Sequence, residues 1–189
     1  MNYNQMLLET ISRDLGVKEI PGELDHPQIV LAHKIARVIS QKIKPEGKER
    51  IDEIPWCSSM MNLWILRTSA RLNFGRVRDW MANQGFTYDI VEEALGHEPN
   101  IEDNGVRVPG PTWSARAISW RDWGSPVAPK DAQPGDIVVL TRSGGAHVGV
   151  FMKRGLLFTS ILGGNQSDKV CQLDNFLNSK VITIRRWNP

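Results

Sequence analysis

The chain has 189 residues, 41% of them hydrophobic, which is enough for one packed domain. Its 23 Lys and Arg residues nearly balance 21 Asp and Glu residues, so the net charge is only +2. This balance gives no support for nucleic-acid binding, which calls for a strongly basic face. No apolar stretch approaches the length of about 18 residues that a membrane span needs, and the N-terminus lacks the apolar region of a secretory signal. We therefore expect a single domain over residues 1–189, made in the cytoplasm, with no nucleic-acid partner and no membrane span.

The N-terminal part of the chain has the pattern of helices. Residues 3–15 carry apolar side chains at helical spacing and are followed by Gly16, a common residue after a helix end. Asp25 or His26 can cap a second helix, in whose first turn Pro27 would lie. Because both signals are local, they predict two short helices before residue 40.

A third helix is predicted to begin beside a cysteine. Pro55 is favoured in the first turn of a helix, and closely spaced apolar residues follow it up to Trp64. Cys57 then lies in that first turn, where unpaired backbone N–H groups and the helix dipole favour an anion. The thiolate is the nucleophilic form of cysteine, so this position predicts a lowered pKa and a reactive Cys57. The other cysteine, Cys171, lies in an alternating pattern and is expected to be a small, half-buried residue without a disulfide.

A nucleophilic cysteine needs a base, and His147 is the best placed of the four histidines. It begins a strand after a glycine turn, and a strand is a rigid platform for a catalytic imidazole. A third group must hold the ring in one tautomer. We favour Asn165, whose carbonyl can accept the imidazole N–H, with Gln166 and Asp168 as alternatives in the same turn.

The second half of the chain changes to the period of strands. The candidate strands are residues 136–141, 146–153, 156–162, 169–173 and 181–186. Glycine-containing turns join the first four, which favours antiparallel pairing. Helices first and antiparallel strands after predict an α+β fold.

Five motifs occur in an order that resembles the CHAP-like branch of the cysteine peptidoglycan amidohydrolases, a superfamily that includes the NlpC-type peptidases. The motifs are Pro55-Trp56-Cys57-Ser58, Ala115-Arg116 with Trp123-Gly124, Pro134-Gly135-Asp136-Ile137-Val138-Val139, Gly145-Ala146-His147-Val148-Gly149 and Gly163-Gly164-Asn165-Gln166-Ser167-Asp168. The resemblance covers roughly residues 1–66 and 112–189. It implies a papain-like arrangement, with the cysteine helix packed on a curled antiparallel sheet, and hydrolysis of an amide bond without a cofactor.

Two further roles complete the expected site. Backbone N–H groups near Cys57 and Ser58 would hold the oxyanion, and Trp56 would line the substrate groove. A metal site is not expected, because neither the cysteines nor the histidines form a closely spaced pair. Asp136 is interpreted as a turn residue at the start of a strand.

Two segments of the chain lie outside the five motifs. Residues 70–111 read as a small helical insertion near the mouth of the active site, which binds substrate or serves as a lid or spacer. The polar segment 40–54 reads as a loop that includes Asp52 and Glu53. These two carboxylates are interpreted as residues that precede a helix, with amine binding or a calcium loop as alternatives.

The sequence therefore predicts a monomeric enzyme that cleaves bacterial peptidoglycan. It would be an N-acetylmuramoyl-L-alanine amidase or a stem-peptide endopeptidase, most simply a phage endolysin released through a holin. The alternatives are an amidase effector of type VI secretion and a non-catalytic wall-binding or virion module that keeps the fold. In the enzymatic interpretations, a separate delivery step brings the chain to the cell wall or periplasm.

Overall fold

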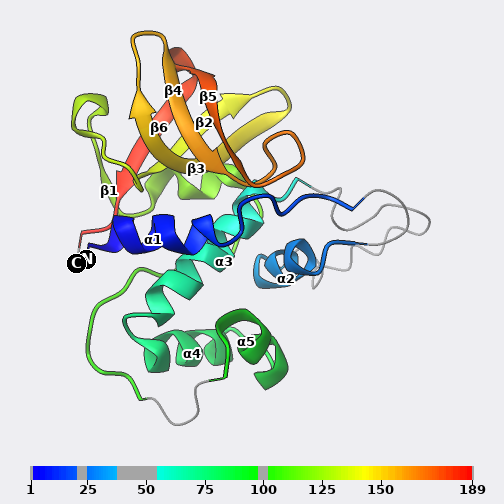
Figure 1. The fold of residues 1–189 in the computed structure, drawn as a ribbon. Coiled ribbons are helices and arrows are strands. Elements are labelled where there is room, and N and C mark those ends of the chain that lie inside the picture. Colours follow the sequence, from blue (N-terminus) through cyan, green and yellow to red (C-terminus); the bar gives the residue numbers. More distant parts are fainter. Residues whose placement is uncertain (1, 21–24, 38–54, 98–101, 189) are drawn as a thin grey trace.

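The computed structural model describes residues 2–20, 25–37, 55–97 and 102–188, and helices precede strands along the chain (Figure 1). The predicted loop 40–54, with Asp52 and Glu53, lies entirely outside these described residues. The helices are α1 (Tyr3–Ser12), α2 (Pro27–Ile35), α3 (Cys57–Ala70), α4 (Phe74–Asn83) and α5 (Tyr88–Leu95). Short 3-10 helices are η2 (Ala117–Asp122), η3 (Pro129–Asp131) and η4 (Asn178–Lys180). The strands are β1 (Ser125–Pro126), β2 (Ile137–Arg142), β3 (Gly145–Arg154), β4 (Phe158–Gly163), β5 (Cys171–Leu177) and β6 (Val181–Arg186).

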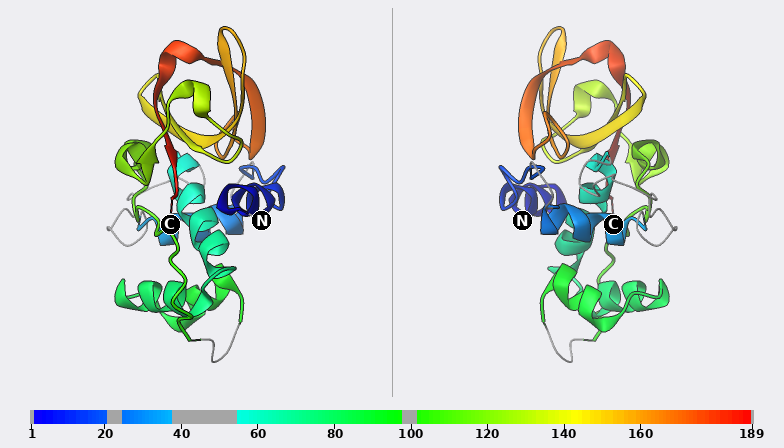
Figure 2. Two further views of the ribbon diagram at one scale, coloured as in Figure 1. Left: turned by 90° about the vertical axis from the view of Figure 1, so that its left-hand side faces the viewer. Right: turned by 90° about the vertical axis from the view of Figure 1, so that its right-hand side faces the viewer.

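The six strands form one antiparallel sheet in the order β1-β6-β2-β3-β4-β5. The sheet is strongly curled, as the views in Figure 2 show. All five predicted strands are present, and the structure adds the short edge strand β1. The predicted α+β class is confirmed, as is the packing of the Cys57 helix against the sheet.

Helix α2 begins for the predicted local reasons, whereas α1 ends at Ser12, three residues earlier than predicted. His26 is the N-cap of α2, and its side chain accepts a hydrogen bond from the backbone N–H of Gln28 at 3.2 Å. Pro27 is the first helical residue, where its missing N–H costs no hydrogen bond. The residues from Thr112 to Arg116 form no helix, and η2 begins only at Ala117. Thr112 contacts the side chains of Asn62 and Ser119 instead.

Helix α3 is the centre of the molecule. It contacts α1, α2, α4, α5 and β3, and every residue in it except Arg67 and Ala70 is buried. Apolar groups on all sides explain why its sequence shows no clean amphipathic period. Because α3 packs on the sheet through its first turns, the start of this helix is held firmly against strand β3.

The two faces of β3 serve two apolar clusters. Val148 and Val150 point to the larger cluster, which they share with α3 and the other helices. Phe151 belongs to the smaller cluster, on the inner face of the curled sheet. Since side chains alternate along a strand, His147 leaves β3 on the same face as Phe151.

Asp136 is a structural residue, as predicted. Its buried carboxylate accepts hydrogen bonds from Arg186 Nε and Nη2, both at 2.7 Å, and from Asn4 Nδ2 at 2.8 Å. It thereby joins α1, β6 and the turn before β2. Losing one partner of such a buried pair costs several kcal/mol, so these contacts tie the first helix to the last strand.

The segment 70–111 contains the two predicted helices, α4 and α5. They pack at the C-terminal end of α3, away from the sheet (Figure 1). Arg67 anchors this end through a hydrogen bond from Nε to the carbonyl oxygen of Ala94 at 3.0 Å. The insertion therefore extends the helical half of the molecule at the end of α3 opposite to Cys57.

Candidate active site

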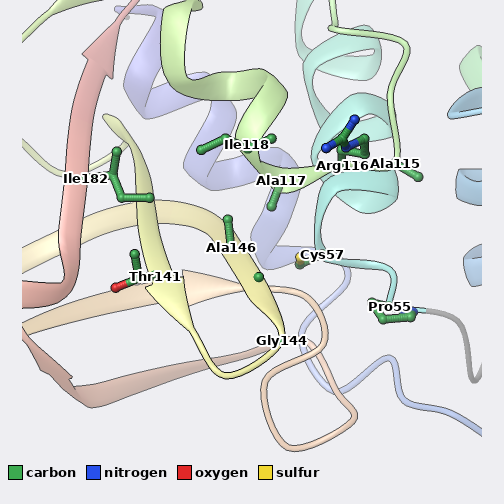
Figure 3. A pocket seen from close by; sticks show the side chains of 11 residues that line it. Pro55, Cys57, Ala115, Arg116, Ala117, Ile118, Thr141, Gly144, Ala146 and Ile182 are labelled. Atoms are coloured by element: carbon green, nitrogen blue, oxygen red, sulfur yellow. The ribbon is translucent and has the colours of Figure 1, made fainter.

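A pocket of about 480 Å³ opens at the start of α3, between η2 and the β2–β3 hairpin. Its lining consists of Pro55, Cys57, Ala115, Arg116, Ala117, Ile118, Thr141, Gly144, Gly145, Ala146 and Ile182. Figure 3 shows the Cys57 sulfur beside Ala117 and Ala146, with Thr141 and Ile182 at the other end of the pocket. None of the described residues within 70–111 lines the pocket, so this part of the insertion does not form its mouth as expected.

Cys57 is the first residue of α3, and it is only 4% exposed. Burial raises the pKa of its thiol, because an anion is disfavoured away from water. The backbone N–H groups of Val148, Ser58 and Cys57 act in the opposite direction, as does the positive charge of Arg142. Burial outweighs them all, so the prediction of a lowered pKa is wrong for the free protein.

The sulfur of Cys57 lies at strand β3, next to the predicted base. The backbone N–H of Val148 faces this sulfur and stabilises its anionic form. Val148 follows His147 directly, so the backbone of β3 brings the two predicted catalytic residues near each other in the fold. The imidazole itself leaves the strand on the other face, where it stacks on Phe176. Within the described residues no hydrogen bond joins His147 to Cys57, since both ring nitrogens of His147 have no partner there.

His147 has an apolar setting. It is 1% exposed, and its ring stacks on Phe176 of β5, with 5.8 Å between centroids and 16° between planes. Burial, helped by the positive charge of Arg142, lowers the pKa of His147 to about 4. The imidazole is therefore neutral at physiological pH, which is the form that can accept a proton.

Gln166 is the polar side chain that the structure brings to this ring. It is 3% exposed, and its amide lies close enough to His147 to oppose, in small part, the lowering of the imidazole pKa. Its Nε2, with two N–H donors, lies within hydrogen-bond distance of three backbone carbonyl oxygens, those of Ile161, Gly163 and Cys171. These contacts fix the amide so that Oε1 remains as an acceptor, and Oε1 has no partner among the described residues. Gln166 Oε1 and the His147 ring are both buried, and both lack a partner in the described part of the chain. Gln166 Oε1 is therefore available to accept the imidazole N–H and so to orient the ring.

Asn165 and Asp168 are less well placed for that role. Asn165 is half-buried, and in the described part of the chain its side chain makes no hydrogen bond. Asp168 is exposed, and its backbone carbonyl accepts from Glu19 N–H at 3.1 Å. Both residues have positive φ angles, 56° and 59°, as does Ser167 at 53°. This left-handed backbone turns the chain sharply, so that Gln166 alone points inward.

Trp56 lies beneath the site rather than in the groove. It is fully buried, and its Nε1 donates to Glu19 Oε1 at 2.9 Å. A Cβ added at Gly164 would lie 2.5 Å from Trp56 Cζ3, so only glycine permits this contact. Trp56 thus fixes the start of α3 against the turn that carries Gln166. The expectation that it lines the groove does not agree with this burial.

Ser58 holds the wall of the pocket through its side chain. Its hydroxyl donates to the carbonyl oxygen of Ser114 at 2.7 Å and accepts from Trp120 Nε1 at 2.9 Å. Asn62, one turn later, donates to the same Ser114 oxygen at 2.8 Å. These bonds fix the segment that carries Ala115 and Arg116. Only the backbone N–H of Ser58 remains for an oxyanion.

Three contributions to the site have no clear signal in the sequence. The Val148 N–H is a backbone group, which no residue pattern marks. Phe176 lies in a strand whose end the sequence placed several residues too early. Nothing in the sequence around Glu19 marks it as a site residue. The antiparallel bridge between Lys18 and Lys169 places it where its carboxylate accepts a hydrogen bond from Trp56.

The lowered pKa of His147 predicts how stability depends on pH. The unfolded chain takes up a proton near pH 6.5, whereas the folded protein does so only near pH 4. Stability is therefore complete above pH 6.5 and falls as the pH drops toward 4. Between pH 7 and 4.5, His147 should account for a loss of about 2.5 kcal/mol in the free energy of unfolding. Urea titrations of the wild type and His147→Gln at both pH values measure this difference, and an equal loss in the variant would contradict it.

Comparison of the sequence with models of protein families and with curated proteins found no match. None of the helices in the described residues has the length and apolar character needed to cross a membrane.

Proposed function

We propose that this protein is a cysteine hydrolase that cleaves an amide bond of bacterial peptidoglycan. The observation that carries the proposal is the place of Cys57 at the start of α3, where it opens into a pocket and its sulfur faces the backbone N–H of Val148. His147 precedes Val148 on β3, and the unpartnered oxygen of Gln166 lies beside its ring, so the proposed reaction requires the imidazole to turn from Phe176 toward Cys57. A nucleophile, a base and an orienting acceptor are the parts that acyl transfer needs.

The two pKa shifts favour a neutral resting pair. Burial raises the pKa of Cys57 and lowers that of His147, so a preformed thiolate–imidazolium pair is disfavoured. The imidazole would instead take the thiol proton as sulfur attacks the carbonyl carbon. The imidazolium then gives this proton to the leaving amine, which leaves a thioester on Cys57. Water, deprotonated by His147, attacks the thioester and releases the carboxylic acid and the free thiol.

The negative charge that develops on the carbonyl oxygen needs hydrogen-bond donors. The backbone N–H groups of Cys57 and Ser58 lie at the start of α3, where no helical partner satisfies them. They support the oxyanion role expected for this position. The Ser58 hydroxyl is not needed for it, since both of its contacts are structural.

The character of the pocket supports a peptide substrate. Its walls are mostly apolar, and Arg116 is the one charged residue among the described residues that line it. Among the described residues, the Arg116 guanidinium has no hydrogen-bond or ion-pair partner. It can therefore pair with a carboxylate, and the stem peptides of peptidoglycan carry free carboxylates.

Delivery to the wall is part of the proposal. A phage endolysin released through a holin fits a wall hydrolase that is made in the cytoplasm, and delivery by type VI secretion is the alternative route. In both cases the chain acts on the cell wall as a monomer.

A digest of purified Gram-negative sacculi tests the proposal. The wild type should release soluble fragments, read by mass spectrometry, that are absent with Cys57→Ala. Free stem peptides would identify an amidase, and shortened peptides still joined to disaccharide would identify an endopeptidase. The absence of products with the wild type on both Gram-negative and Gram-positive walls would count against hydrolysis and favour a binding module.

A further inference from the structure

The β3–β4 turn carries the most exposed apolar residues of the described chain. We call Leu156, Leu157, Phe158 and Leu177 the apolar tip. Their exposed fractions are 94%, 62%, 43% and 44%. Both views of Figure 2 place this hairpin at one pole of the molecule, while α4 and α5 lie at the other. Apolar side chains gathered on a protrusion mark a contact surface rather than an ordinary solvated turn.

The backbone of the apolar tip is bonded from within. Asn178 Nδ2 donates to the carbonyl oxygens of Gly155 and Leu156 at 3.1 and 2.9 Å. The backbone N–H of Asn178 donates to the carbonyl oxygen of Leu157 at 2.9 Å. Its Oδ1 accepts from the Thr159 hydroxyl at 2.7 Å. A turn normally leaves such carbonyls to water. Here they are already satisfied, which removes most of the cost of moving the turn out of water.

Positive charges surround this protrusion. Arg154 and Lys180 have no ion-pair partner in the described residues, and Lys153 pairs with Asp174 at 3.2 Å. Asp174 is the one carboxylate in this group, so two cations remain uncompensated. Basic groups around an apolar turn complement a surface that is negatively charged outside and apolar within.

We propose that the apolar tip inserts into the interface of a lipid bilayer that contains anionic headgroups. Leu156 and Leu157 would enter the acyl boundary, while Arg154 and Lys180 stay at the level of the headgroups. A bilayer is favoured over a protein partner because uncompensated cations adjoin the apolar tip and its backbone carbonyls need no external donor. This contact is peripheral, and it does not depend on the hydrolytic activity proposed above.

Vesicle co-sedimentation of the full chain tests this proposal. Phosphatidylcholine vesicles that contain phosphatidylglycerol should retain the wild type, and retention should fall as salt is raised. The double variant Leu156→Ser/Leu157→Ser should bind at least about tenfold more weakly, since each leucine loses its transfer from water. Both side chains are exposed, so the variant should keep the melting temperature of the wild type.

Two controls separate insertion from other causes. Leu15→Ser makes the same change at an exposed leucine (54%) near α1, and it should leave vesicle binding unchanged. Arg154→Gln/Lys180→Gln should weaken binding to anionic vesicles and leave the weak binding to pure phosphatidylcholine unaltered. Failure of the wild type to bind anionic vesicles would overturn the proposal, and so would equal binding by the serine double variant. Self-association that the serine double variant abolishes, without vesicle binding, would assign the tip to a protein contact instead.

Discussion

Replacing Cys57 with alanine is expected to lower the rate of peptidoglycan hydrolysis by a factor on the order of 10⁴ or more. The proposed reaction passes through a thioester on this sulfur, and alanine can form no covalent intermediate. The pocket offers no second nucleophile in its place, since Thr141 lies at the opposite end of the lining. Turbidity loss of sacculi, measured with wild type and variant at equal concentration, gives the ratio of rates.

The fold should survive this change. Cys57 lies at the pocket wall, so removal of one sulfur leaves little enclosed space and should cost at most about 1–2 kcal/mol. Cys171→Ala is the matched control, because it deletes the other thiol of the chain. That thiol donates only to the Gln166 carbonyl oxygen, at 3.2 Å, so hydrolysis should stay within a few-fold of wild type. Wild-type activity in Cys57→Ala would refute the nucleophile, and equal losses in both variants would point to damage of the fold.

The parts of this fold that local chemistry determines could be predicted from the sequence. The change from helical to alternating period after residue 124 separates the two halves, and the five predicted strands follow from it. Pro27 is the first residue of α2, where proline loses no hydrogen bond, whereas Pro55 lies just outside α3, which begins at Cys57 after the N-cap Trp56. The approach of α3 to β3 came from the resemblance of the motifs, not from any local pattern.

The chemistry of the site depends on packing, and there the sequence was a weaker guide. The helix start at Cys57 predicted a lowered pKa, and its N–H groups do act in that direction. Their effect is smaller than that of burial, which arises from α3, β3 and Trp56 packing together. Segments far apart in the chain make this burial, so inspection of residues 52–64 could not reveal the sign of the shift.

The same limit explains the choice between Asn165 and Gln166. The sequence favoured Asn165 for its amide oxygen, but Gln166 beside it carries the same group, so the chemistry of the side chains does not separate them. Backbone angles decided the matter: Asn165, with φ of 56°, lies at the bend, and Gln166 is turned inward. A left-handed non-glycine residue is uncommon, and asparagine is among the residues that tolerate it best.

Substituting Gln166 with alanine is expected to reduce kcat by about 10²- to 10⁴-fold, the range for losing control of a catalytic histidine. Without the amide oxygen, the ring nitrogen that should donate to it has no acceptor, and the tautomer that accepts the Cys57 proton is no longer favoured. KM should change only a few-fold, because Gln166 does not line the pocket. Steady-state kinetics on soluble fragments from the sacculus digest would separate the two constants.

The matched control is Asn165→Gly, which removes the neighbouring amide and keeps the left-handed backbone without strain. Its kcat should stay within a few-fold of wild type. The two variants must be compared as folded proteins, because Gln166 Nε2 also lies within hydrogen-bond distance of three carbonyls that Ala leaves without this donor. Melting curves therefore accompany the kinetics. A large loss in Asn165→Gly with a small one in Gln166→Ala would return the orienting role to Asn165; a rise in KM alone for Gln166→Ala would make Gln166 a structural support of the turn.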